Sequence, residues 1–277
     1  EALPYAEASA NGLRRILGNR QAGRDPDMLL AKNTLSITYR QLGRYGESEA
    51  IAREAVEESR LLLGDKHPTT SSLYVSLARS LMRQDRNSEA EVHFRRALEG
   101  RRAVFGDDNE DVLYSQADIA NLLAQEGRSD EAERMLREVI ANHRRLFGVN
   151  HVNTSDFAYD LAILLSERGQ FEEAEALLTQ EVLPQWRRSL GNENRGTLRV
   201  MYDLASVLEG KGEIAKARAL LEQVLETQRR VLGDLDEDTL NSLRRLAEMT
   251  RAEGDVVRTE SLLREALAGY RRSLGDD

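Results

Sequence analysis

Three aspartates in this chain of 277 residues recur at a nearly constant spacing. Asp118, Asp160 and Asp203 lie 42 and 43 residues apart, and Tyr159 and Tyr202 directly precede two of them. An ionised carboxylate only accepts hydrogen bonds, so a row of carboxylates favours a basic ligand. A tyrosine beside a carboxylate could hold an arginine by cation–π contact and ion pairing. The alternative is a solvated acidic surface with partly packed tyrosines.

The elements that would position these side chains belong to a repeat of about 42 residues. Glycines that close the repeat stand at Gly64, Gly106, Gly148, Gly191, Gly233 and Gly275. A second, opening position recurs in the same register at Gly43, Asp85, Gly127, Gly169, Gly212 and Gly254. A fixed period of this length is typical of a solenoid, in which each unit packs only against its neighbours.

Each repeat contains the pattern of two helices. The apolar spacing of Leu73, Leu77 and Leu81 predicts a first amphipathic helix, helix A. Leu136 and Val139 show the same spacing after the opening position and predict a second helix, helix B. The opening glycine suits the positive φ at the end of helix A, so an antiparallel hairpin follows.

Small residues recur on both helices and allow them to approach closely. On helix A they are Ser36, Ala78, Ala120, Ala162, Ala205 and Ala247. On helix B they are Ser48, Ala90, Ala132, Ala174, Ala217 and Thr259. The predicted fold is therefore all-α, an α-solenoid of antiparallel helix pairs. We expect this solenoid to be right-handed.

The predicted organisation is a single solenoid domain. Residues 1–18 form a lone helix B, from Tyr5 to Leu17, and six repeats follow at 26–64, 65–106, 107–148, 149–191, 192–233 and 234–275. The fourth repeat has one extra residue and contains Pro184 inside its helix B. Because proline has no N–H, we expect a kink or a bulge there.

The small residues, the leucines around them and the two-helix layout resemble tetratricopeptide repeats. The linkers LGDKHPTTSSL (63–73) and FGVNHVNTSDF (147–157) look most like those of kinesin light chain repeats. The resemblance implies that helix A lines a concave groove in which an extended peptide commonly lies. It also implies a groove asparagine, for which this chain instead has Thr34, Ser76, Asp118, Asp160, Asp203 and Arg245.

The groove predicted on this basis is acidic in its middle and more basic towards its ends. The candidate peptide-binding residues are Arg79, Tyr114, Asp118, Asn121, Asp156, Tyr159, Asp160, Arg199, Tyr202, Asp203, Ser206, Asn241 and Arg245.

Composition excludes several classes of function. The chain has 48 acidic against 39 basic residues and a net charge of −9, which argues against binding to nucleic acid or to an anionic membrane. It has no cysteine, so thiolate metal sites and cysteine nucleophiles are excluded, and a cytoplasmic protein is expected. The apolar runs are too short to cross a bilayer. The chain begins at Glu1 rather than methionine, so we expect a piece of a larger protein.

Other motifs have structural explanations. Arginines four residues before each closing glycine fit the negative end of helix B, and the acidic runs 107–111 and 234–238 fit helix N-termini better than calcium loops. No histidine pair has the spacing of a zinc site, and no nucleophile elbow or phosphate loop is present. No metal, cofactor or catalytic residue is predicted.

The leading hypothesis is a non-enzymatic interaction module whose groove takes a peptide or partner segment, with basic residues favoured in that ligand. A second hypothesis is a regulatory arm that contacts a catalytic domain of the same protein, such as a bacterial kinase, NTPase or protease. A third is weak self-association through the solenoid end, where residues 256–274 expose Val257, Leu262, Leu263, Ala266 and Leu267.

Overall fold

The computed structural model describes residues 8, 11–12, 15, 26–148 and 151–274. The chain divides into two compact units, Glu1–Leu146 and Phe147–Asp277. The predicted helix from Tyr5 to Leu17 lies, apart from a few positions, outside the described residues.

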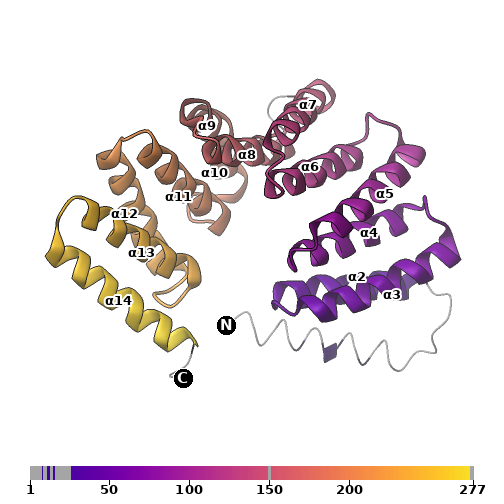
Figure 1. Cartoon of the computed structure of the whole chain (residues 1–277), viewed down its shortest axis with the longest axis horizontal. Coiled ribbons are helices and arrows are strands. Elements are labelled where there is room, and N and C mark those ends of the chain that lie inside the picture. Colours follow the sequence, from indigo (N-terminus) through magenta and orange to yellow (C-terminus); the bar gives the residue numbers. More distant parts are fainter. Residues whose placement is uncertain (1–7, 9–10, 13–14, 16–25, 149–150, 275–277) are drawn as a thin grey trace. The chain divides into compact units, whose positions relative to one another are not determined.

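The described residues of both units are helical, with short turns between helices (Figure 1). Unit 1 holds α2 (Pro26–Gln41), α3 (Tyr45–Leu63), α4 (Pro68–Met82), α5 (Asn87–Phe105), α6 (Glu110–Gln125) and α7 (Ser129–Phe147), whose last residue falls in unit 2. Unit 2 holds α8 (Val152–Glu167), α9 (Phe171–Leu177), η1 (Leu178–Val182), α10 (Leu183–Leu190), α11 (Arg195–Gly210), α12 (Ile214–Val231), α13 (Glu237–Ala252) and α14 (Val256–Leu274).

Neighbouring helices pack as pairs, and the pairs then stack. In unit 1, α2 packs on α3 and α4 on α5, while α3–α4 and α5–α6 join consecutive pairs. In unit 2, α11 packs on α12 and α13 on α14, and α12–α13 joins the two pairs. The predicted all-α solenoid of antiparallel helix pairs is confirmed in each unit. The limits of the individual repeats and their union in one domain stay predictions.

The small positions predicted on both helices are buried in this packing. All twelve side chains are buried, and none exposes more than 7% of its surface. In the first pair the hydroxyl oxygens of Ser36 and Ser48 lie 3.0 Å apart, and Ser48 also donates to the carbonyl of Ser36. In the last pair, the hydroxyl oxygen of Thr259 lies 3.0 Å from that of Thr250, three residues after the small position Ala247. Close approach of helices A and B therefore follows from the sequence pattern.

The opening positions of the repeats all have a positive φ, between 58° and 83°. Five of the six are glycine, and Asp85 is the non-glycine among them, with a φ of 58°. Residues with a Cβ resist this left-handed conformation, although aspartate tolerates it better than most.

The variant Asp85→Gly is expected to raise the free energy of unfolding by about 0.5 to 1 kcal/mol, because it removes this backbone strain. Urea unfolding of the variant and of the wild type measures the difference. Asp85→Ala, which keeps a Cβ, serves as the control and should give no such gain. An equal effect of both variants would contradict the strain argument.

The predicted bulge lies directly before Pro184. The helix B of the fourth predicted repeat contains a π-helical turn, Leu178–Val182, between α9 and α10. In this turn the N–H of Leu183 donates to the carbonyl of Leu178, five residues earlier, which accommodates one additional residue. Pro184 follows directly after this turn, in the first turn of α10.

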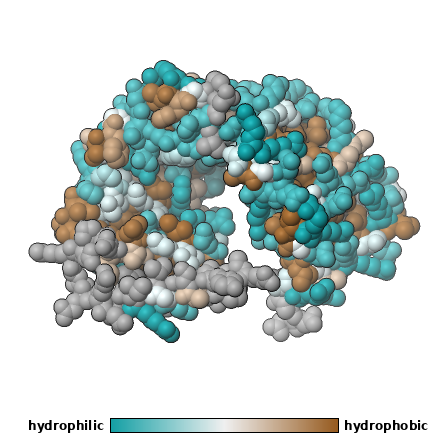
Figure 2. Space-filling model, turned by 180° about the vertical axis from the view of Figure 1, so that it is seen from behind, coloured by the Kyte–Doolittle hydropathy of each residue, from teal (hydrophilic) through white to brown (hydrophobic). Residues whose placement is uncertain are grey.

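The surface is largely polar. Seen from behind, the molecule is mainly hydrophilic with separate hydrophobic patches (Figure 2). In the described parts of the chain, no helix combines the length and the apolar character needed to cross a membrane.

Candidate functional site

The predicted groove residues all lie on A helices. Arg79 is on α4; Tyr114, Asp118 and Asn121 are on α6; Asp156, Tyr159 and Asp160 are on α8; Arg199, Tyr202, Asp203 and Ser206 are on α11; Asn241 and Arg245 are on α13.

In unit 1, Arg79 reaches the next A helix and binds Asp118. Its Nη2 lies 2.9 Å from Oδ1 and 3.2 Å from Oδ2 of that carboxylate. Burial raises the pKa of Asp118, and the charge of Arg79 opposes this rise. Asp118 is thus not the free carboxylate expected from the sequence, and a basic ligand would have to displace Arg79.

Two further arginines that the sequence analysis missed stand beside this pair. Arg40 at the end of α2 and Arg83 just after α4 line, with Arg79 and Tyr45, an open pocket of about 470 Å³. Arg83 donates to the hydroxyl of Tyr45 at 3.0 Å, and its guanidinium lies 5.4 Å from the centre of that ring. This part of unit 1 is therefore basic.

In unit 2, three predicted residues come together on α8 and α11. The hydroxyl of Tyr159 donates to Oδ2 of Asp203 at 2.6 Å, and Nε of Arg199 lies 3.8 Å from the same oxygen. Burial raises the pKa of Asp203, while Tyr159, Arg199 and Arg245 act to lower it. Burial and the Asp203 charge also raise the pKa of Tyr159, so its hydroxyl stays protonated as a donor.

An aromatic neighbour of this cluster was not predicted. The rings of Tyr159 and Trp186 lie with their centres 5.3 Å apart at an angle of 42°. Trp186 belongs to α10, directly after the π-helical turn, and is half-buried. Beside it, Gly196 at the start of α11 leaves room for the ring, since a Cβ there would lie 3.2 Å from the indole. The bulge therefore helps to place Trp186 against Tyr159.

A second contact in unit 2 joins α11 and α13. The guanidinium of Arg245 lies 5.6 Å from the centre of the Tyr202 ring, and its Nη2 lies 2.5 Å from Oε2 of Glu209. One arginine is thus already held by a tyrosine and a carboxylate.

The other predicted residues have separate partners. Asn241 accepts a hydrogen bond from Tyr270 of α14 at 3.1 Å, and the hydroxyl of Ser206 donates to the carbonyl of Tyr202 in its own helix. The remaining four are half-buried, and each already takes part in a polar, ionic or ring contact: Tyr114, Asn121, Asp156 and Asp160.

The linkers confirm that the acidic runs lie at helix N-termini. Asn109 caps α6 and Asp236 caps α13, each through a side-chain oxygen that accepts the N–H two residues later. Asp236 and Asp238 also bind Arg195, at 3.1 and 2.5 Å. His67 and His151 cap α4 and α8 in the same way through Nδ1, a role that the sequence analysis did not assign.

The arginines before the closing glycines lie in the last turns of helices, as predicted. They are Arg60, Arg102, Arg144, Arg187, Arg229 and Arg271. Arg60 and Arg102 also bind the aspartates that follow in the linkers, Asp65 at 3.0 Å and Asp107 at 2.8 Å. Their positive charges therefore have structural roles.

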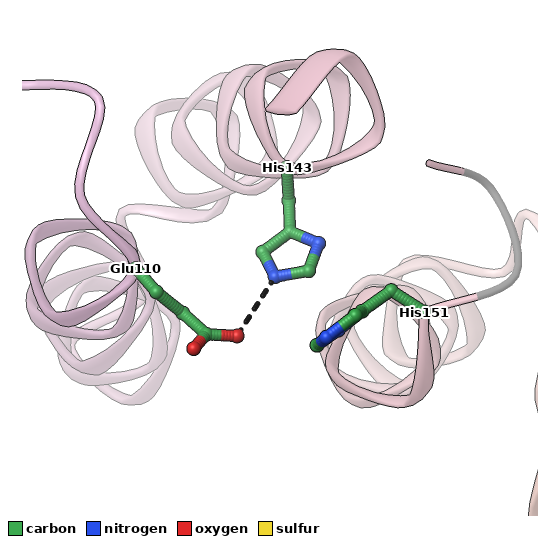
Figure 3. A group of neighbouring side chains, drawn as sticks. All are labelled: Glu110, His143 and His151. Atoms are coloured by element: carbon green, nitrogen blue, oxygen red, sulfur yellow. Dashed lines mark hydrogen bonds and ion pairs between the residues drawn. The ribbon is translucent and has the colours of Figure 1, made fainter. Parts of the chain in front are cut away.

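Two histidines of unit 1 lie on B helices, as expected. His143 of α7 is fully buried and places Nε2 3.1 Å from Oε1 of Glu110 on α6 (Figure 3). His93 of α5 stacks on Tyr74 with ring centres 5.6 Å apart, and its Nδ1 is buried without a hydrogen bond from the described residues.

His93 is expected to make unit 1 acid-sensitive. Burial, with the charges of Arg53 and Arg96, lowers the pKa of His93 from 6.5 to about 4. The folded state then binds fewer protons than the unfolded state between these values, so stability falls as the pH drops through this window. We expect this residue to account for a loss of about 1 to 2 kcal/mol, allowing for solvent screening of a half-buried ring. Urea unfolding at pH 7 and at about pH 4 should show a smaller loss for His93→Gln than for the wild type.

At the end of unit 2, α14 exposes part of its apolar face. Val257, Leu263 and Leu267 are 81%, 44% and 51% exposed, as predicted. Ala266 is instead buried and Leu262 half-buried, because α13 packs on that side of the helix. Self-association through this end stays a prediction.

Comparison with known families gives one consistent result. A family model described as tetratricopeptide repeat matches residues 27–103, 69–144, 116–182 and 178–230, and a second model with the same description matches 239–277. No curated protein matches the chain.

Solved structures share the fold at low sequence identity. A kinesin light chain of Podosopora anserina with nearly identical TPR-like repeats has 24% identity and a TM-score of 0.63, over 75% of this chain and 98% of that one. A Rap protein complexed with competence and sporulation factor has 11% identity and a TM-score of 0.63, over 96% and 80%. A signal transduction ATPase of Pyrococcus horikoshii with a tetratricopeptide repeat sensor has 14% identity and a TM-score of 0.62, over 88% and 36%.

Proposed function

We propose that this chain, which belongs to the tetratricopeptide repeat family, is a non-enzymatic scaffold that holds a segment of a partner protein along its A helices. Repeats of this family indicate a protein–protein interaction scaffold, and the fold is typically non-catalytic. The partner segment can belong to a separate protein or to another domain of the same polypeptide. The Pyrococcus horikoshii ATPase, a protein of numerous domains with a tetratricopeptide repeat sensor, is a precedent for such repeats within a multidomain protein.

The observation that carries this proposal is the set of aromatic and arginine side chains in unit 2. Tyr159 with Trp186, and Tyr202 with Arg245, lie half-buried on neighbouring elements. Tyrosine, tryptophan and arginine dominate the energetics of protein interfaces, because they combine large contact areas with hydrogen bonding. Arg199 beside them is more exposed and retains donors for a ligand.

The charge of the ligand is less restricted than the sequence suggested. Asp203 already accepts a hydrogen bond from Tyr159 and has Arg199 beside it, and Asp118 already binds Arg79. A basic side chain would therefore compete with internal partners at both carboxylates. The proposed binding contribution of unit 2 is instead aromatic contact with the partner segment, with the Arg199–Asp203 pair orienting its polar groups.

The test is capture of peptides from an arrayed library by the full 277-residue chain. We expect the Tyr159→Ala variant to weaken binding of captured peptides by about tenfold or more, as truncation of a central interface tyrosine commonly does. Tyr159→Phe keeps the ring and removes only the hydrogen bond to Asp203, so its effect should be smaller. Leu61→Ala, at an exposed position of α3, should leave affinity unchanged. Peptide capture that Tyr159→Ala leaves intact would contradict the assignment to unit 2.

A further inference from the structure

A pocket of unit 1 concentrates positive charge in a chain that is acidic as a whole. The pocket is lined by Arg40 of α2, Arg79 of α4 and Arg83, which caps the C-terminus of α4. The net charge of the whole chain, by contrast, is −9. Two carboxylates stand near the three guanidinium groups. Asp118 is bound by Arg79, and Asp85 is one of the residues that line the pocket. The surroundings of the pocket therefore keep a net positive charge.

Arg40 is the most unusual of the three. It is half-buried, and no described residue forms a hydrogen bond or an ion pair with it. Burial lowers the pKa of Arg40, and repulsion from Arg79 and Arg83 lowers it further. Arginine stays charged in proteins, so this side chain holds a cation next to two others, and the charge of Asp118 offsets their repulsion only in part.

The other two arginines keep free donors on the same pocket. Arg79 uses Nε and Nη2 to bind Asp118, and Arg83 uses Nε and Nη2 to bind the hydroxyl of Tyr45. In both, Nη1 donates to none of the described residues. Each guanidinium is thus fixed by one partner and still offers an amino group.

We propose that this pocket binds a phosphate monoester, carried on a phosphorylated side chain of the partner segment. A phosphate group has three acceptor oxygens and a charge of about −1.5 to −2 at neutral pH. It can accept from guanidinium groups that approach from two helices, whereas one carboxylate offers two oxygens in a plane and a single charge. The free donors of Arg40, Arg79 and Arg83 match the first geometry.

This inference rests on the proposed function in one respect, namely that a partner segment carries the phosphate group. The pocket itself can be tested with a small probe, so failure of peptide capture by unit 2 and failure of the phosphate site give different results. We suggest titrating the full chain with N-acetyl-O-phosphoserine amide at constant ionic strength and following the arginine side-chain resonances by NMR. N-acetylglutamate amide serves as the carboxylate counterpart.

We expect saturable shifts of Arg40, Arg79 and Arg83 with the phosphorylated probe, and binding about tenfold weaker with the glutamate probe. Arg40→Gln and Arg83→Gln should each weaken binding of the phosphorylated probe several-fold. Arg95→Gln removes the same charge from an exposed position of α5 and should have little effect. Asp85→Gly removes a carboxylate that lines the pocket and should tighten binding.

Three results would overturn the inference. The first is no saturable shift of these arginines with the phosphorylated probe. The second is equal binding of the phosphorylated and glutamate probes, which would assign a general anion site. The third is an equal weakening of phosphorylated-probe binding by Arg40→Gln and Arg95→Gln. This result would mean that only the overall charge of the chain matters, and not the position of the arginine. The variant Asp85→Gly is expected to stabilise the fold. Its effect on binding of the phosphorylated probe therefore tests the site even if an arginine variant folds poorly.

Discussion

The variant Phe94→Ala is expected to lower the free energy of unfolding by about 3 to 5 kcal/mol. Phe94 lies on α5 with none of its side chain exposed, and it is among the largest fully buried side chains of the described residues. Truncation removes its apolar contacts and leaves a cavity that the surrounding helices fill only in part. In a solenoid each pair depends on its neighbours, so the loss should spread to the packing of α4 and α6 on α5.

Urea unfolding followed by circular dichroism measures this effect. Phe105 provides a matched control, because it ends the same helix but is 41% exposed. Phe105→Ala should cost about 1 kcal/mol or less, since exposed apolar groups contribute little to folding. Similar losses for the two variants would mean that α5 does not bury the face on which Phe94 lies.

The fold could be predicted because each structural requirement recurs in every repeat. A single alanine such as Ala120 or Ala132 does not by itself indicate a packing role. Small residues occupy the same two positions in all six repeats, however, and close packing of the two helices explains all of them. The opening glycines give a similar argument, because a positive φ is needed at every turn from helix A to helix B. Pro184 predicted the bulge for the opposite reason, because it is an exception to the regular pattern of the B helices.

The candidate site was less predictable because its contacts join different repeats. Arg79 and Asp118 are 39 residues apart, and Tyr159 and Asp203 are 44 apart, so neither pair follows from spacing along one helix. The sequence placed these residues on A helices but could not show that each aspartate already has a partner. Its preference for a basic ligand depended on free carboxylates.

The arginine pocket of unit 1 has no repeating signal at all. Arg40 stands three residues before its opening position, and Arg83 stands two before its own. They meet only because consecutive A helices, α2 and α4, pack side by side. The contact of Trp186 with Tyr159 was not predicted for a related reason. The π-helical turn shifts the helical register of the residues after it, so the repeat pattern does not show which way Trp186 faces.

The second large effect is expected from Ser48→Leu, with a loss of about 3 kcal/mol or more in the free energy of unfolding. Ser48 is fully buried between three helices, where its hydroxyl lies 3.0 Å from that of Ser36 on α2 and 2.7 Å from that of Ser80 on α4. Leucine would force α2 and α3 apart, because the site has space only for a small side chain. It would also remove the hydrogen bonds that link the three hydroxyl groups.

The variant Ser48→Ala separates the steric effect of the larger side chain from the loss of the hydrogen bonds. Alanine occupies the equivalent position in several other repeats, for example Ala90 and Ala132, so it should fit without strain. Its cost should be about 1 to 2 kcal/mol, from the lost hydrogen bonds alone. Ser88→Leu, at an exposed position of α5, controls for the added apolar side chain. If leucine at position 48 costs no more than alanine, close approach of helices A and B does not limit this residue, and the packing role assigned to the small positions would be wrong.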